Sequence, residues 1–309
     1  MGLDRRGWHR LEQLSLRDDW RVAAVTDPRA DRRNVARVSC PVVVDSLDDL
    51  LATAGLSGVI VTEPPKQRAL IVQHCLLAGK EVWLEPPLSD DLRQVRRLQT
   101  LARERRVALH VLQTQRYDPK FRAALTAVRS GRLGSLRSLR LVSAEWTTFV
   151  GDQGAAACPL VDPVEQFGPH GFDQLLGLID SDPHWVWARR CSGEDGFLAV
   201  IGFTNGVTAQ IEVRRRARAT LHTGWVLEGE AASYQEGRII SVAADGELID
   251  EPVIVEPPRD DPFIVSLTNG VGPGDAEDRR AWLTVGLMLA VQKSSNRNAA
   301  IRWDEVVGG

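Results

Sequence analysis

Up to residue 118 the chain alternates short apolar segments with amphipathic ones, and this alternation restricts the possible folds more than any other feature. Residues 20–27, 41–46 and 57–65 are short and rich in β-branched side chains, as expected of strands buried on both faces. Segments with helical periodicity separate them. This spacing predicts an α/β domain with a doubly wound parallel sheet and right-handed crossovers. In such a sheet, ligands bind beyond the carboxyl ends of the strands.

From residue 135 onward the pattern changes to short alternating strands separated by turn residues. It predicts an open, mainly antiparallel sheet of roughly five to seven strands, interrupted by one helix over residues 163–180. A last helix covers residues 278–296, and loops are expected at 151–157 and 256–274. We therefore expect a Rossmann-like domain over residues 1–118 and an α+β domain over residues 119–309, with the terminal helix packing back on the first domain.

Composition excludes several classes of protein. With 309 residues, 43% hydrophobic and 26% charged, the chain has the make-up of a soluble globular protein. A net charge of −3 and the lack of an aromatic and basic platform argue against a nucleic-acid partner, although Arg214, Arg215 and Arg216 form a basic run. The four cysteines lack metal-site spacing, so no metal is expected. No apolar run is long enough to span a membrane, which predicts a cytoplasmic protein without a membrane partner.

The first seven residues, MGLDRRG, resemble a dinucleotide-binding loop. Gly2, Asp4 and Gly7 stand at the three glycine positions of G-x-G-x-x-G, and Asp27 follows Gly7 by 20 residues, the spacing of an acid that binds a ribose hydroxyl. The strand that normally precedes the loop is missing, and Asp4 brings negative charge to an anion site. An upstream start would supply the strand but would not change Asp4. The alternative is that Asp4 only caps the helix and no dinucleotide binds.

Several segments, in order and spacing, resemble the Gfo/Idh/MocA oxidoreductases, the relatives of glucose–fructose oxidoreductase and inositol dehydrogenase. They are GLDRRGWHRL with VAAVTDP, GVIVTEPP with AGKEVWLEPPLS, QRYDPKFRAA, EQFGPHGFDQLLGL, and VLEGEAASY before RWDEV. The resemblance covers nearly the whole chain. It implies a Rossmann domain that binds NAD or NADP, and a sheet domain that binds a sugar or polyol-like substrate and often forms the oligomer interface. The usual chemistry is reversible hydride transfer.

The family's Glu-Lys-Pro loop matches Glu85, Pro86 and Pro87 here, so proline replaces the lysine that lies near cofactor and substrate. Proline has no ionisable group, which excludes the usual lysine chemistry. Lys80 and Lys120 are not expected to replace it. By resemblance and position, the cofactor-binding residues are expected to be Gly2, Asp4, Gly7, Asp27, Thr62, Glu85 and Pro86.

A second family motif, Asp-x-Gly-x-His-x-x-Asp, matches Gly168, His170 and Asp173, with Gln166 in place of the first aspartate. The resemblance implies that His170 is the acid/base, because histidine titrates near neutrality, and that Asp173 orients it. It also implies substrate binding by Arg116, Gln166 and His170. The alternatives are a satisfied, partly buried histidine, and an arginine that forms a salt bridge at the domain junction.

Two functions from different classes therefore stand side by side: a divergent NAD(P)-dependent oxidoreductase acting on a sugar or polyol-like substrate, and a non-catalytic ligand-binding or scaffold relative that has lost the cofactor. Hydrolysis or elimination without net redox, found in distant relatives, is a third. Asp27 favours NAD, although Arg29 and Arg32 could serve a 2′-phosphate. Glu145 and Trp146 end a strand, where solvation and packing are favoured over a role in the pocket. We expect a homodimer or homotetramer through the C-terminal sheet.

Overall fold

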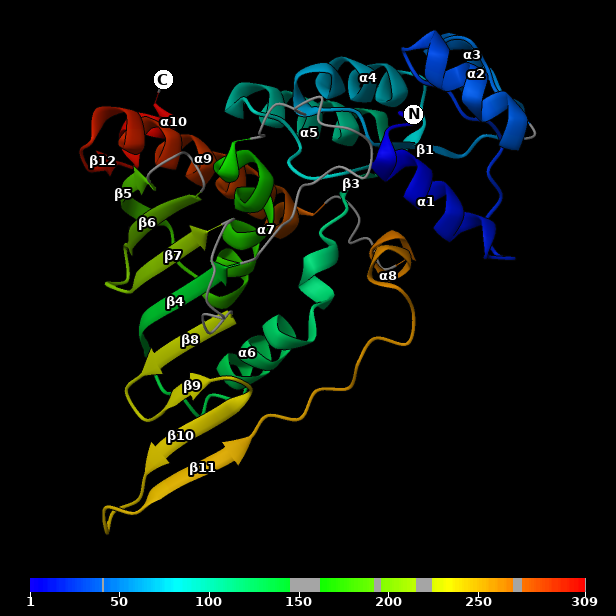
Figure 1. Ribbon diagram of the computed structural model, residues 1–309. Coiled ribbons are helices and arrows are strands. Elements are labelled where there is room, and N and C mark those ends of the chain that lie inside the picture. Colours follow the sequence, from blue (N-terminus) through cyan, green and yellow to red (C-terminus); the bar gives the residue numbers. More distant parts are fainter. Residues whose placement is uncertain (41, 145–161, 192–195, 215–223, 269–273, 309) are drawn as a thin grey trace. The chain divides into compact units, whose positions relative to one another are not determined.

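Figure 1 shows the computed structural model, which describes residues 1–40, 42–144, 162–191, 196–214, 224–268 and 274–308. The chain forms two compact units. The first comprises Met1–Thr114 and Pro258–Val285, and the second comprises Gln115–Pro257 and Gly286–Gly309. The sequence predicted a boundary at residue 118, with the terminal helix packing back on the first domain. In the structure, residues 258–285, which include the first part of that helix, group with the first unit.

The described residues of the first unit contain a parallel sheet with the strand order β1 (Gly58–Val61), β2 (Glu81–Leu84) and β3 (Leu109–Val111). The connection from β1 to β2 runs through α4 (Pro65–Leu77), and the connection from β2 to β3 runs through α5 (Leu92–Arg105). This arrangement confirms the predicted doubly wound architecture, because parallel neighbours require crossover helices.

The strands expected over residues 20–27 and 41–46 are present only as extended segments. They share a single isolated parallel bridge between Val25 and Val43, so the prediction of two regular strands is wrong. A regular strand over residues 20–26 would need a full-length partner strand between these residues and β1. Among the residues that the structure describes, only two lie in that position.

Those two residues are Met1 and Gly2, which lie between the extended segment and β1. The Met1 amine donates to the Ile60 carbonyl over 2.8 Å, and the Gly2 N–H donates to the Thr26 carbonyl over 3.0 Å. Thr62 N–H in turn donates to the Met1 carbonyl over 2.9 Å. The first strand was expected to be missing; Met1 and Gly2 lie in its position and bond to both neighbours.

Side chains at the helix starts account for several boundaries of the first unit. Asp4 accepts from Gly7 N–H at the start of α1 (Arg5–Ser15), and Ser46 accepts from Asp49 N–H at the start of α3 (Leu47–Leu51). Asp91 caps α5, because its side chain accepts from the N–H groups of Arg93 and Gln94. A helix also lies within the segment 256–274 that was predicted to be a loop. The remaining helices of this unit are α1 (Arg5–Ser15), α2 (Ala30–Ser39), α3 (Leu47–Leu51), α8 (Pro262–Thr268) and the first part of α9 (Asp275–Arg297).

The described residues of the second unit form one sheet of nine strands, in the order β11-β10-β9-β8-β4-β7-β6-β5-β12. All neighbours are antiparallel except β4 and β7, which run parallel. The mainly antiparallel sheet is confirmed, but five to seven strands were too few. The strands are β4 (Leu136–Ala144), β5 (Pro183–Arg190), β6 (Gly196–Phe203), β7 (Thr208–Arg214), β8 (Gly224–Gly229), β9 (Ser233–Gln235), β10 (Arg238–Val242), β11 (Leu248–Pro252) and β12 (Ile301–Arg302).

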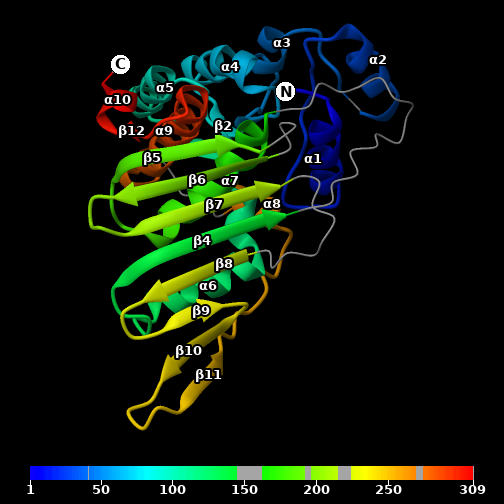
Figure 2. The same ribbon diagram turned by 60° about the vertical axis from the view of Figure 1, so that its left-hand side comes forward.

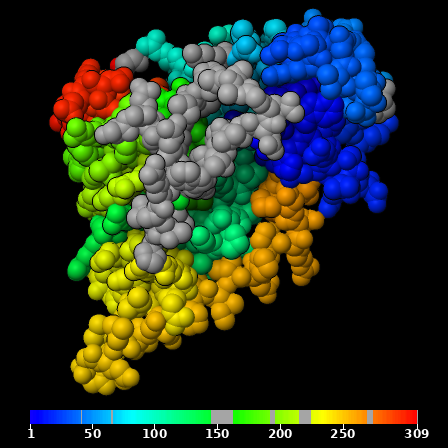
Figure 3. Space-filling model, in the orientation of Figure 1, coloured from blue at the N-terminus to red at the C-terminus, as the bar shows by residue number. Residues whose placement is uncertain are grey.

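The two strands that the sequence missed lie at the two edges of this sheet. β11 is exposed along its whole length and β12 has two residues, so neither shows the alternating burial that marks a strand in sequence. Figure 1 shows the β10–β11 hairpin at one end of the sheet, and Figure 3 shows the same part of the chain in yellow at the bottom of the view.

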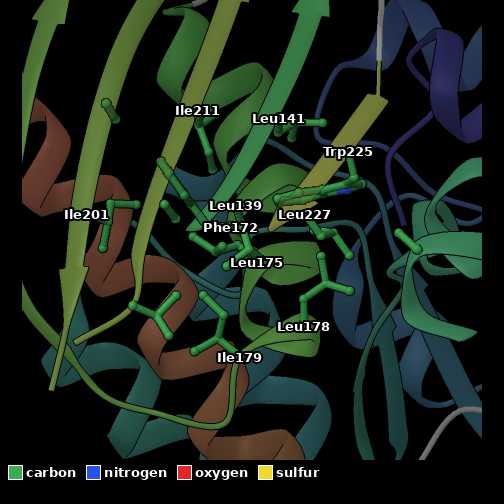
Figure 4. Packing of buried hydrophobic residues seen from close by; sticks show 14 of the residues in the cluster. Leu139, Leu141, Phe172, Leu175, Leu178, Ile179, Ile201, Ile211, Trp225 and Leu227 are labelled. Carbon is green, nitrogen blue, oxygen red and sulfur yellow. The ribbon is translucent and has the colours of Figure 1, made fainter. Parts of the chain in front are cut away.

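Two helices, α6 (Pro119–Arg129) and α7 (Pro163–Leu178), cover one face of the nine-stranded sheet (Figure 2). The core lies between α7 and the sheet, where Phe172 and Leu175 pack among strand residues such as Leu139 and Ile211 (Figure 4). The second part of α9 and α10 (Asp304–Val307) complete the unit.

Some predictions concern residues outside the described ranges. Glu145, Trp146, the loop 151–157 and Arg215 with Arg216 are among them, so their expected roles stay predictions. None of the helices in the described part of the chain is both long enough and apolar enough to cross a membrane.

Candidate active site

The glycine-rich loop of the first unit is packed too closely to admit side chains at its two glycines. Gly2 has φ +96°, and a Cβ there would lie 2.5 Å from the Thr62 hydroxyl oxygen. A Cβ on Gly7 would lie 2.0 Å from the Gly2 carbonyl oxygen. Thr62 donates to the Gly2 carbonyl over 2.9 Å and so closes the loop against the end of β1. The first and last glycines therefore satisfy the steric demands of a dinucleotide-binding turn.

Asp4 occupies the start of α1 with its own carboxylate. Its Oδ1 accepts from Gly7 N–H over 3.0 Å, as an N-cap does. The helix N-terminus is where an anionic ligand would otherwise find free N–H donors. Arg5 and Arg6, in the first turn of α1, are exposed and carry the opposite charge.

Asp27, the residue predicted to bind the cofactor ribose, accepts hydrogen bonds from the protein's own backbone. Its side chain is fully buried and accepts from Leu3 N–H over 2.7 Å and from Arg29 N–H over 2.8 Å. Arg32 contributes a third contact over 3.3 Å. Asp27 thus ties the glycine-rich loop to the end of the neighbouring segment. Arg29 is paired with Asp31 over 2.7 Å.

Glu-Pro-Pro occurs at the tips of two adjacent strands, after β1 and after β2, and Arg68 joins the two tips. Arg68 is 1% exposed; its Nε donates to the Glu63 carbonyl over 2.9 Å and its Nη1 donates to the Pro87 carbonyl. Burial lowers the pKa of Arg68 to about 10, although the nearby Glu85 carboxylate opposes this shift. The repeated Glu-Pro-Pro was the signal in the sequence that could have revealed this connection.

The two glutamates of these tips differ sharply in their partners. Glu85 accepts from Arg10 Nε over 2.7 Å, and Pro86 beside it is buried in the unit. Glu63 Oε1 is buried without a hydrogen-bond partner in the described structure. Burial, with a contribution from the negative charge of Asp27, raises the pKa of Glu63 above its ordinary value. The sequence patterns did not single out Glu63. A bound ligand would explain a buried carboxyl oxygen that lacks a hydrogen-bond partner beside a glycine-rich loop.

In the second unit, Arg116 and Asp173 form a two-pronged ion pair. Arg116 Nε lies 2.7 Å from Asp173 Oδ2, and Nη2 lies 2.6 Å from Oδ1. Both residues belong to the second unit, where the pair ties Arg116 to α7. The sequence left a salt bridge open as an alternative role for Arg116, and the pair exists. The predicted roles of Arg116 in substrate binding and of Asp173 in orienting His170 stay predictions.

Gln166, His170 and Asp173 lie on one face of α7, since residues three and four apart share a helix face. Gln166 and His170 are half-buried, whereas Asp173 is buried. Gly168 permits close packing, because a Cβ there would lie 3.1 Å from Met288 Cγ. The three motif residues therefore share one face of α7, and their catalytic and binding roles stay predictions.

A cavity of about 220 Å³ opens beside α7 in the second unit. Its lining includes Gly171 and Gln174 from α7, Trp225 from β8 and Lys120 from α6. Gln174 is fixed there, because its Oε1 accepts from Trp225 Nε1 over 3.1 Å and its Nε2 donates to the Gln115 carbonyl over 2.8 Å. Lys80, the other lysine considered, donates to a turn carbonyl of the first unit.

Comparison with known proteins matches residues 1–113 to the model of an oxidoreductase family with an NAD-binding Rossmann fold, GFO_IDH_MocA. The chain belongs to the Gfo/Idh/MocA oxidoreductase family. Over its whole length this family member is 24% identical to myo-inositol 2-dehydrogenase of Thermotoga maritima, covering 98% of that protein. It is 25% identical to inositol 2-dehydrogenase of Rhizobium meliloti over 61% of this chain and 56% of that protein. With two further curated relatives the match spans less than half of their length.

The fold of this Gfo/Idh/MocA member also matches solved structures. Scyllo-inositol dehydrogenase from Lactobacillus casei, solved with bound NAD(H) and scyllo-inositol, gives a TM-score of 0.74 at 18% identity, covering 98% of this chain and 97% of that one. The likeness at this identity concerns the fold. It confirms a Rossmann-type unit followed by a sheet unit.

Proposed function

We propose that this chain is an NAD(P)-dependent oxidoreductase that acts on a sugar or polyol-like substrate. The observation that carries the proposal is the closed packing of Gly2, Gly7 and Thr62, where a side chain on either glycine would collide with the loop. Such a turn is what a dinucleotide pyrophosphate needs in order to approach the backbone. The inositol dehydrogenases among the relatives support a polyol-like substrate.

Three groups of the first unit would hold the cofactor. Arg5 and Arg6 are exposed in the first turn of α1 and offset the charge of Asp4, so their guanidinium groups would bind the pyrophosphate. Glu63, with its pKa raised by burial, presents a buried carboxyl that in its neutral form would donate a hydrogen bond. The preference for NAD rested on Asp27 binding a ribose hydroxyl. Its carboxylate already accepts from backbone N–H groups, so Asp27 does not decide between NAD and NADP.

The second unit would supply the acid/base. A bound NAD(P) would supply hydride-transfer chemistry, by which an alcohol is converted to a carbonyl compound. One imidazole nitrogen of His170 takes the hydroxyl proton, because Pro86 provides no titratable group. Gln166, one helical turn before His170, would hydrogen-bond a neighbouring hydroxyl. The Arg116–Asp173 pair would keep this face of α7 in place.

Cofactor binding is tested by titrating NADH and NADPH against the tryptophan fluorescence of the protein. We expect saturable quenching that the replacement Arg6→Ala weakens about tenfold, as loss of one charge-assisted contact would. Arg105→Ala, which removes an exposed arginine at the end of α5, is the matched control and should leave affinity unchanged. If neither nucleotide binds at millimolar concentration, the proposed function is wrong.

Three observations favour the second candidate, a non-catalytic relative that binds a ligand or serves as a scaffold. Asp4 caps α1, Asp27 is saturated by internal hydrogen bonds, and Pro86 is buried. Calorimetry with inositols and sugars, run beside assays of NAD⁺ and NADP⁺ reduction with the same compounds, separates the two. Binding without hydride transfer in any pairing supports the non-catalytic relative, and turnover excludes it.

Assembly through the sheet of the second unit is part of this proposal. The β10–β11 hairpin exposes Val242, Leu248 and Ile249, with exposed fractions of 67%, 65% and 40%. Exposed apolar side chains on an edge hairpin are a feature that a subunit interface would cover. Light scattering should give a dimer or tetramer. Replacing Leu248 with Asp should shift the mass toward the monomer.

A further inference from the structure

The cavity beside α7 has an outer part with polar side chains and an inner part with aromatic ones. It measures about 220 Å³, and its whole lining belongs to the second unit. Gln115 and Lys120 of the lining are exposed. Phe172, Phe197 and Trp225 are buried, with exposed fractions of 0%, 1% and 4%. A ligand would therefore meet polar groups first and aromatic rings deeper in the cavity.

The buried rings of this cavity are held in fixed positions. The rings of Phe172 and Phe197 lie with their centroids 6.2 Å apart and are tilted by 39°. Trp225 donates its indole N–H to Gln174 Oε1 over 3.1 Å. Figure 4 shows Phe172 and Trp225 among the side chains that fill the core between α7 and the sheet. Since the indole N–H is already bonded, Trp225 offers its apolar ring to an incoming group.

The inner part of the cavity suits an apolar group. Gln174 is a buried polar residue of the lining, and both ends of its amide are bonded within the protein. Its Oε1 accepts from Trp225, and its Nε2 donates to the Gln115 carbonyl over 2.8 Å. A ligand hydroxyl buried among the rings would lose its bonds to water and find Gln174 already occupied, which costs free energy. An apolar group pays no such cost.

The size of the cavity matches one aromatic ring. Close packing leaves few voids larger than a water molecule in a protein interior, and a volume of about 220 Å³ is far above that size. An apolar cavity of about 150 Å³ lined by leucine, isoleucine and phenylalanine is large enough to bind benzene. Aromatic rings also attract one another in edge-to-face and offset arrangements. The cavity therefore has the volume and the lining to bind a six-membered aromatic ring.

Gly171, the residue after His170, leaves room on the α7 side of this cavity. A Cβ at Gly171 would lie 3.6 Å from Leu141 Cδ2, which is an ordinary contact, and both residues line the cavity. At Gly168 the corresponding distance to Met288 Cγ is 3.1 Å, so close packing explains that glycine. Glycine destabilises a helix interior relative to alanine, and packing gives no reason for it at position 171. A large side chain there would enter the cavity.

We propose that the substrate of this chain is an aryl glycoside, a sugar joined to an aromatic ring, and that the cavity beside α7 binds the ring. The ring lies against Phe172, Phe197 and Trp225, and the sugar lies toward the exposed polar residues of the lining. His170 and Gly171 are successive residues of α7, so the candidate acid/base and the ring subsite share one helical turn. The sugar part of this inference rests on the proposed function, whereas the aromatic subsite rests on the cavity alone.

Calorimetry without any nucleotide tests the proposal. The probes are phenyl and methyl β-D-glucoside, phenyl and methyl β-D-galactoside, and phenol. For at least one of the two sugars, the phenyl glycoside should bind at least about tenfold more tightly than the methyl glycoside, because its ring leaves water for an apolar cavity. It should also bind more tightly than phenol. Failure of NADH to bind would overturn the proposed function but would leave this comparison intact, since no nucleotide is present.

Two variants fill the cavity from opposite walls. Gly171→Leu places a large side chain on the α7 side. Ser143→Phe does so from β4, where Ser143 lies on the same strand face as Leu141, because alternate residues of a strand share a face. Each variant should abolish the preference for phenyl over methyl glycosides. Gly171→Ala is the matched control and should keep the preference. Tm identifies the folded variants, and either blocking variant alone decides the result.

Several results would overturn the proposal. One is equal affinity for the phenyl and methyl glycosides of both sugars, and another is a lack of phenyl glycoside binding at millimolar concentration. A third is a preference for the phenyl group that persists in a folded blocking variant, since the ring would then bind elsewhere. Phenol that binds as tightly as the phenyl glycosides would show that the cavity takes a ring without an attached sugar, which excludes a glycoside as the substrate.

Discussion

Arg116 donates hydrogen bonds to both carboxylate oxygens of Asp173, with N–O distances of 2.6 and 2.7 Å. The Asp173 side chain is 1% exposed and the Arg116 side chain is 21% exposed, so the ion pair is largely buried. The pair joins a turn at the start of the second unit to the middle of α7, the helix that carries His170. Its strength therefore bears on the geometry of the candidate catalytic face.

Replacing Asp173 with Asn should lower the free energy of unfolding by about 3 kcal/mol, because it removes one partner of a largely buried ion pair. Urea unfolding at neutral pH measures the change. Asp180→Asn, at an exposed position just after α7, is the control and should stay within about 0.5 kcal/mol of the parent. A loss at Asp173 no larger than at Asp180 would show that the pair contributes little in solution.

Glu63 and Glu85 hold matching positions at two neighbouring strand tips, and their replacement by Gln should have opposite consequences. Burial raises the pKa of Glu63, so between about pH 4.3 and that raised pKa the folded chain binds more protons than the unfolded chain. Stability therefore falls as pH rises through this window. Glu63→Gln should abolish that fall and leave the protein at least as stable at pH 7.

Glu85→Gln removes the charge that pairs with Arg10 over 2.7 Å and should cost about 3 kcal/mol at pH 7. Unfolding curves of both variants from pH 4 to pH 8 make the comparison. If Glu63→Gln retained the parent's pH dependence, a group other than Glu63 would have to be responsible for it.

The amine of Met1 should make stability rise with pH. Its pKa in the folded chain is lowered by desolvation, so between that value and about 8 the unfolded chain binds more protons. The free energy of unfolding therefore increases as pH is raised through this window and levels off above it. Acetylation of the amine should remove the increase. Tm measured between pH 6 and pH 9, before and after acetylation, checks this, and an unchanged slope would contradict the burial of the charged group.

Patterns of apolar residues were enough to predict the parallel and antiparallel sheets, because burial of strands leaves a mark in the sequence. Edge strands carry no such mark, and β11, exposed throughout, was missed for that reason. The site was predicted only in part. Motif positions pointed to His170 and Gly2 as candidates. The partners of Asp27 and Arg116 depend on which groups the folded chain brings together, and the missing hydrogen-bond partner of Glu63 Oε1 is evident only in the described structure.

His170 should control the pH dependence of any turnover that the protein shows. If its imidazole takes the hydroxyl proton, His170→Asn should lower kcat at least about a hundredfold and remove the acid limb of the pH profile, because asparagine cannot accept a proton near neutrality. His184→Asn, at an exposed position on β5, is the control and should leave kcat and the profile unchanged. NADH affinity should be the same in both variants, since His170 belongs to α7 and not to the nucleotide loop. A variant at position 170 that keeps the parent's pH profile would assign the proton transfer to another group, and Lys120 beside the cavity of the second unit would be the next residue to replace.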